Sequence, residues 1–145
     1  MNSLPYYFDS TVEKLVIGTC LIDKNCVTFF RGRGMAKQWF YSSVMRLIWE
    51  SMCDLDDQNK DVDVVTVTLD LAEKGQADKA QPFLIAELAG DVVSSSNAEH
   101  LHTQLSEQIK LRRLYMLNTK FQTLLLEQPS DSDYLIAFLD DALQR

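Results

Sequence analysis

The sequence predicts an all-α fold in which a small globular helical head is followed by a C-terminal helical hairpin. Apolar residues recur at i, i+3, i+4 and i+7 in several segments, which is the spacing of a helix with one buried face. The stretch from Ser95 to Leu126 contains no Gly or Pro, so it can form one long helix. The β-branched run 64–68 has no partner strand elsewhere, and a lone strand is not stable. We therefore expect a head at 1–95 and a hairpin, acting as a dimerisation subdomain, at 96–145.

The first part of the chain predicts an irregular arm and then a helix. Residues 1–8 form the arm, whose aromatic residues fold it back onto the body. Ser10 and Glu13 have the spacing of a capping box, in which a hydroxyl and a carboxylate satisfy the first free N–H groups of the helix. Gly18, inside this helix, costs about 1 kcal/mol relative to Ala, and close approach of a neighbouring helix is the expected reason. The predicted buried stripe comprises Val12, Leu15, Val16, Thr19 and Cys20.

Four shorter segments follow within the head. Residues 25–30 are expected to form a short helix, which the RGRG run at 31–34 ends. A strong helix spans Trp39 to about Asp54, and an acidic loop follows as far as residue 63. Residues 64–74 form a helix that Gly75 terminates. A further short helix covers 83–89.

The long helix changes character along its length. Ser96 and Glu99 form a second capping-box pattern, and the helix is amphipathic as far as Ile109. Beyond Leu111 it is apolar on most sides, which indicates burial on most sides. The turn at Pro129 and Ser130 leads into a last helix, 132–144, that is too short to cover this surface. The excess predicts a second protein chain, packed on Leu114, Leu117, Phe121, Leu124, Leu125, Tyr134 and Phe138.

Composition excludes several classes of function. The chain has 145 residues and a net charge of −7, which disfavours binding to a phosphate backbone. Its three cysteines form no C-x-x-C pair and are expected to be reduced thiols packed as small hydrophobes in a cytoplasmic protein. No segment approaches the roughly 18 apolar residues that would span a membrane. No phosphate-binding glycine loop occurs, so we expect no catalysis and no cofactor in this chain.

Three polar clusters are candidate binding sites. His100 and His102 are two residues apart on a predicted helix, so they cannot chelate one metal, and solvated side chains are expected. Asp61 and Asp63 lack the Gly and terminal Glu of a calcium loop, which favours a solvated loop. The RGRG run at 31–34 is typical of a surface turn rather than of a nucleic-acid contact in an acidic protein.

Several ordered segments resemble a known family. They are STVEKLVIG (10–18) with LID (21–23), FY (40–41) with IW (48–49), VDVVTVTL (62–69), EL (87–88), Asn97 and LRRL (111–114). Together they resemble the N-terminal domain of the bacterial replicative DNA helicase of the DnaB type, over nearly the full length of the chain.

The resemblance implies a non-catalytic assembly and docking domain that functions in DNA replication. In such helicases the hairpins pair between subunits, and the heads form a collar of three dimers that receives the C-terminal domain of primase. The candidate primase-binding residues here are Tyr115, Met116, Thr119 and Lys120. The alternative for Tyr115 and Met116 is packing against the head or against a twofold mate. The motor domain, with its ATP and Mg²⁺, is absent from this chain, and no direct DNA contact is expected from the collar.

A second hypothesis is a free-standing all-α adaptor, or a helicase-interacting protein, encoded by a mobile element. The reading frame beyond Arg145 discriminates between the two: a phosphate-binding loop downstream supports the helicase, and a stop codon supports the adaptor. An enzyme is a third and weaker hypothesis, which nucleotide hydrolysis by this chain alone would support.

Overall fold

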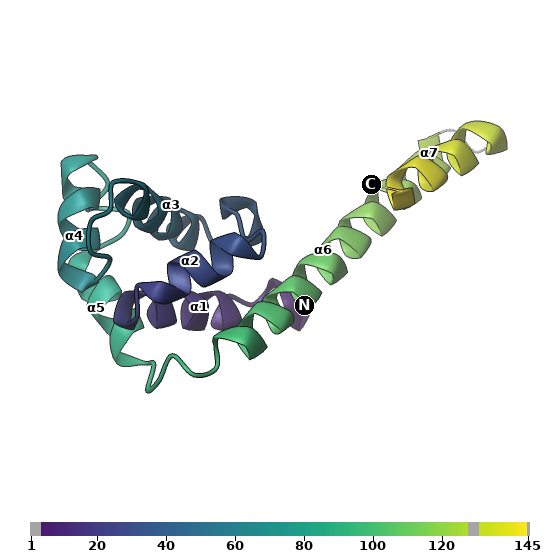
Figure 1. The fold of residues 1–145 in the computed structure, drawn as a ribbon. Coiled ribbons are helices and arrows are strands. Elements are labelled where there is room, and N and C mark those ends of the chain that lie inside the picture. The colour runs from purple at the N-terminus through teal and green to yellow at the C-terminus, as the bar shows by residue number, and fades with distance from the viewer. Residues whose placement is uncertain (1–3, 128–130, 145) are drawn as a thin grey trace.

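A computed structural model describes residues 4–127 and 131–144, and within these ranges it contains helices and connecting segments but no strand. In Figure 1 the helices α1 to α5 form a head, α6 leaves the head as a long rod, and α7 folds back along the far part of α6. The predicted all-α head with a C-terminal hairpin is confirmed. The elements are η1 (Tyr6–Phe8), α1 (Thr11–Ile22), α2 (Asn25–Gly32), η2 (Lys37–Trp39), α3 (Ser43–Asp57), α4 (Val64–Glu73), α5 (Pro82–Gly90), α6 (Ala98–Glu127) and α7 (Ser132–Gln144).

The β-branched segment forms α4 because its ends are well capped. The Asp63 carboxylate accepts a hydrogen bond from the Thr66 N–H, and the Thr66 hydroxyl accepts one from the Asp63 N–H, both at 2.9 Å. This reciprocal pair satisfies two of the free donors at the helix start. At the other end Gly75 has a φ of 71°, a conformation that ends helices and favours glycine. The predicted helix at 64–74 is confirmed, and Asp63 is a helix cap rather than a solvated loop residue.

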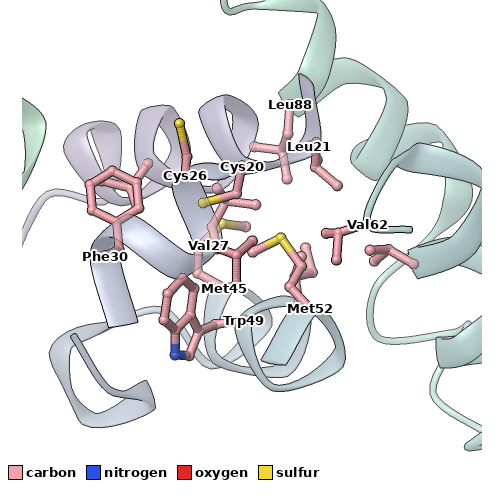
Figure 2. Close-up of a cluster of buried hydrophobic side chains, with 14 of the residues drawn as sticks. Cys20, Leu21, Cys26, Val27, Phe30, Met45, Trp49, Met52, Val62 and Leu88 are labelled. Carbon is pink, nitrogen blue, oxygen red and sulfur yellow. The ribbon is translucent and has the colours of Figure 1, made fainter. Parts of the chain in front are cut away.

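The core of the head lies between α1, α2 and α3. Side chains from these helices meet in Figure 2, where Cys20, Val27, Met45 and Trp49 point toward one another. All four are at most 2% exposed. The predicted packing of cysteines as small hydrophobes holds for Cys20, which is fully buried.

Helix α1 is crossed closely by α5. A Cβ atom on Gly18 would collide with the carbonyl oxygen of Leu88 and would lie 2.6 Å from Cγ2 of Val92. The predicted close approach of a neighbouring helix at Gly18 is therefore confirmed. The cost of glycine inside a helix is offset by packing that no larger residue permits.

The first predicted capping box is wrong. Ser10 precedes α1 but makes no side-chain capping bond, and the Asp9 carboxylate instead accepts from the N–H and hydroxyl of Thr11. Glu13 is fully buried and turns toward the interior of the head.

Two helix starts also differ from prediction. The segment around Trp39 is a short 3₁₀ turn, and α3 begins only at Ser43, after the cap Ser42. Helix α6 begins at Ala98, where the carbonyl of Asn97 accepts from Leu101 N–H, so the cap position is one residue beyond Ser96.

Helix α6 belongs to both parts of the molecule. Its buried residues are Leu101, Leu105, Gln108 and Arg112, spaced four, three and four apart, so one stripe lies on the head. Beyond Arg112 the helix runs outward, and α7 packs against it (Figure 1). The division at residue 95 stays a prediction, and the predicted turn at Pro129 and Ser130 lies outside the described residues.

Candidate functional site

The point where α6 leaves the head is occupied by a buried arginine. The guanidinium of Arg112 donates to the Glu13 carboxylate at 3.0 Å and to the Gln108 side chain at 3.3 Å. It also donates to the backbone carbonyl of Trp39 at 3.1 Å and to that of Tyr7. This one side chain therefore joins α6 to η1, α1 and η2.

The Glu13 carboxylate is itself held in place by a second hydrogen bond. Glu13 accepts a second hydrogen bond from the N–H of Ser42, at 3.1 Å, and Ser42 caps α3. A buried carboxylate is tolerated when it is paired and hydrogen-bonded, and here both oxygens have partners. We call Glu13, Gln108 and Arg112 the junction cluster.

Aromatic rings surround the junction cluster. Phe8 is 8% exposed and stands edge-on to the rings of Tyr41 and Tyr115, with centroids 5.1 Å away in both pairs. The Arg112 guanidinium lies 5.8 Å from the centre of the Tyr41 ring. Tyr7 also contacts the edge of Tyr115, so the arm folds back onto the body, as predicted, but it does so on α6 and with a 3₁₀ turn at Tyr6–Phe8.

The hairpin has a small core of its own. Phe121 of α6 stacks on Phe138 of α7 with ring centroids 6.5 Å apart, and the Lys120 ammonium lies 5.3 Å above the Phe138 ring. Leu135 of α7 is buried. Phe121 and Phe138, both predicted to face another chain, thus contact each other within one chain.

One flank of the hairpin exposes large apolar side chains. Leu114 and Leu143 line a groove of about 470 Å³ between α6 and α7, together with Leu117. Of the predicted interface residues, Leu117 and Leu124 are half-buried, whereas Leu114, Leu125 and Tyr134 are exposed. The prediction missed Ile136 and Leu143, although their seven-residue spacing on α7 marks one face. The exposed fractions are Leu114 53%, Leu125 42%, Ile136 65% and Leu143 62%.

The predicted primase-binding residues differ in exposure: Met116, Thr119 and Lys120 are exposed, whereas Tyr115 is half-buried. Tyr115 packs against the arm, and the Thr119 hydroxyl donates to the Tyr115 carbonyl. Met116 is 61% exposed and lines a groove of about 360 Å³ at the junction of head and hairpin, beside Trp39 and Arg113. Of the two readings, packing against the head describes Tyr115, and an open surface describes Met116.

The RGRG run is committed to contacts within the chain. Arg31 lies 2.8 Å from the Asp56 carboxylate and 2.9 Å from that of Asp57. The guanidinium of Arg33 lies 4.5 Å above the Phe29 ring. Arg31 and Gly32 are the last two residues of α2, so the predicted turn is found only at Arg33 and Gly34.

The expectation of solvated histidines is wrong for His102. Its ring lies 5.5 Å from that of Trp39 and 6.5 Å from that of Phe30, and its Nε2 atom is buried without a hydrogen-bond partner. His100 is exposed. Among the described residues, no group of three or more His, Cys, Asp or Glu side chains is placed to hold a metal ion.

One carboxyl group between α3 and α4 has a shifted pKa. Burial alone would raise the pKa of Asp70, but hydrogen bonds from Lys74 and Ser51 outweigh it and lower that pKa below its ordinary value. The Ser51 hydroxyl donates at 2.7 Å, and the Lys74 ammonium lies at 2.8 Å. The group links two helices of the head and lies apart from the hairpin.

Comparison with known proteins identifies the family. The model of the DnaB-like helicase N-terminal domain matches residues 7–107. The chain belongs to this family. It is also similar to the replicative DNA helicase DnaB of Rhodothermus marinus, with 28% identity over 109 residues, which are 74% of this chain and 11% of that protein. The chain therefore spans a small part of the length of this curated relative.

A solved structure has the same fold. The crystal structure of the N-terminal domain of DnaB helicase from Mycobacterium tuberculosis superposes with a TM-score of 0.79 at 22% identity, covering 94% of both chains. Because it covers 94% of this chain, the structural match extends beyond residues 7–107, which the family model matches. No helix in the described part of this DnaB-like domain is long and apolar enough to cross a membrane.

Proposed function

We propose that this domain assembles copies of a replicative DNA helicase through its hairpin and receives the C-terminal domain of primase in DNA replication. The observation that carries the assembly proposal is the exposed apolar flank of the hairpin. Leu114 and Leu125 of α6 and Ile136 and Leu143 of α7 are all more than 40% exposed, far from the core of the head. Clustered apolar exposure of this kind marks protein contact sites.

A double substitution tests the assembly. Leu114→Asp with Leu125→Asp should convert the associated particle into a monomer, because a hot-spot residue of an interface typically contributes more than about 2 kcal/mol, or roughly thirtyfold in Kd. Sedimentation velocity measures the mass, and circular dichroism should report unchanged helix content. The matched control is Val65→Asp with Leu69→Asp. Both residues are apolar and exposed on α4 of the head, so the control introduces the same two charges away from the hairpin. A monomeric unmutated chain at high concentration would refute the assembly proposal.

The groove at the junction supports the docking proposal. Met116 and Trp39 give it apolar surface, and Arg113 gives it a cation, which is the mixed character of a protein-binding site. Titration of the cognate primase C-terminal domain should give a weaker affinity for Met116→Glu than for Val65→Glu. If the site spans two subunits, the monomeric variant should also bind primase more weakly, by mass action on the assembled state. Undiminished affinity for the monomer would show that one subunit holds the whole site.

A further inference from the structure

The last buried residue of α6 is also the one that makes the most directional contacts. Leu101 and Leu105 hold the helix to the head by apolar packing alone. Arg112 instead bonds to two side chains and to the backbone carbonyls of Tyr7 and Trp39. Beyond it the hairpin extends without another buried α6 residue (Figure 1).

Directional contacts restrict what apolar contacts allow. An apolar stripe tolerates small rotation and sliding of a helix, since the contact energy is non-directional. The planar guanidinium has its donors in a fixed fork, so several acceptors around it define the position and the roll of the helix that carries it. The acceptors here come from three different segments, and Glu13 is itself held by the N–H of Ser42.

We infer that Arg112 is the positioning residue for assembly: its junction cluster sets the direction in which the hairpin leaves the head. The orientation is thus determined by a residue that is 8% exposed and that hydrogen-bonds to the head of its own chain. The consequence for assembly, which rests on the proposed function, is that copies joined by their hairpins hold their heads at one defined spacing.

The aromatic rings restrict the same joint. Tyr41 lies beside the guanidinium, and Phe8 fills the space between Tyr41 and Tyr115, one turn beyond Arg112. The ring contacts of Tyr115 therefore restrain the turn of α6 that follows the hydrogen bonds of Arg112.

An intrachain distance measures the direction of the hairpin. Spin labels are attached through ketone-bearing non-natural residues at Lys79 of the head and Gln122 of the hairpin, which avoids the three cysteines. Both positions are exposed. Pulsed electron paramagnetic resonance measures the distribution of distances between the two labels. Dilution of labelled chains with unlabelled ones ensures that both labels belong to the same chain. The unmodified junction should give one narrow distribution.

The test variant is Arg112→Met, which keeps length and apolar volume but removes the charge and all donors. The matched control is Arg31→Met. It also removes an arginine that is paired with carboxylates, but both of its partners, Asp56 and Asp57, belong to the head. We expect a severalfold broader distribution for Arg112→Met and an unchanged one for Arg31→Met, with helix content retained in both. A folded Arg112→Met protein with the narrow distribution overturns the inference.

A second, milder variant keeps the inference testable if Arg112→Met fails to fold. If Arg112→Met does not fold, Glu13→Gln is measured, because its amide keeps the shape and an acceptor but loses the charge. Broadening in Glu13→Gln supports the inference, and a distribution like that of the unmutated chain overturns it. Sedimentation of the same samples reports assembly separately. A monomeric unmutated chain would refute the proposed function and leave the intrachain result standing.

Discussion

The Glu13 carboxylate lies 3.0 Å from the guanidinium of Arg112, although 99 residues separate them in the chain. The contact closes the head by joining its first helix to the helix that leaves it. Glu13 is fully buried and Arg112 is 8% exposed, so removal of either partner leaves the other charge buried without its counter-charge, which is strongly destabilising.

Glu13→Ala should lower the free energy of unfolding by about 3–5 kcal/mol, the usual cost of breaking a buried pair. The control is Asp61→Ala, which breaks the exposed Lys24–Asp61 pair of the same 3.0 Å length. That loss should stay below about 1 kcal/mol, because solvent screens exposed pairs. Urea unfolding followed by circular dichroism measures both, and equal losses would show that burial does not strengthen the pair.

Gly18→Ala should destabilise the head although alanine is the better helix former. Its methyl group would meet the Leu88 carbonyl oxygen, a backbone atom that cannot turn aside. The control is Gly32→Ala near the end of α2, where nothing lies within 4 Å of the added Cβ. That variant should gain roughly 0.5–1 kcal/mol, the intrinsic preference of a helix for alanine. Opposite signs in thermal unfolding are the expected result; equal signs would show that α1 and α5 separate easily.

Phe121 and Leu125 should separate hairpin folding from association. Phe121 stacks on Phe138 within the chain, so Phe121→Ala should accelerate hydrogen exchange of the α7 amides. Leu125 is 42% exposed, so Leu125→Ala should leave this exchange unchanged and weaken only the association measured by sedimentation. A faster exchange in Leu125→Ala, measured on the monomer, would assign Leu125 to the hairpin core instead.

The free energy of unfolding of the head should fall at low pH because Asp70 becomes protonated. Its folded-state pKa is lowered, so the carboxylate stabilises the fold at every pH above its unfolded value and this contribution is lost as the pH falls through the folded value. The stability difference between the unmutated chain and Asp70→Asn should therefore be constant above about pH 5 and shrink below about pH 4. Urea midpoints across this range measure it. A difference that grows toward low pH would mean that the folded-state pKa is raised.

The helices were predictable where a local pattern decided them. The helix at 64–74 was predictable because the run has no partner strand and Gly75 ends it, although the cap formed by Asp63 and Thr66 was not predicted. The close neighbour of Gly18 was predictable because glycine inside a helix is unfavourable unless close packing requires it. Glu13 shows the limit of such patterns. It has capping-box spacing with Ser10, but an acceptor is also needed by an arginine 99 residues away, and the long-range partner prevails.

The hairpin shows the same limit for surfaces. Phe121 and Leu125 are four residues apart on one face, and the sequence predicts the same role for both. In the structure α7 covers Phe121 and leaves Leu125 exposed, which depends on where the returning helix lies rather than on the spacing. Ile136 and Leu143 were missed for the same reason. Helix α7 has apolar residues on two sides, and only the position of α6 decides which side is covered and which is exposed.

Helix α6 continues without a break past Arg112, so a small change of its angle at Arg112 becomes a large displacement at its far end. From Arg112 to the end of the helix at Glu127 the axis extends about 22 Å, at about 1.5 Å per residue. A tilt of about 10° at Arg112 displaces the tip by about 4 Å, roughly three quarters of the pitch of one helical turn and enough to misalign a side chain with its intended contact. A small error inside the head therefore becomes a large one at the tip, and in the proposed assembly a substitution in the head would keep two tips from pairing while every residue of the tips stays unaltered.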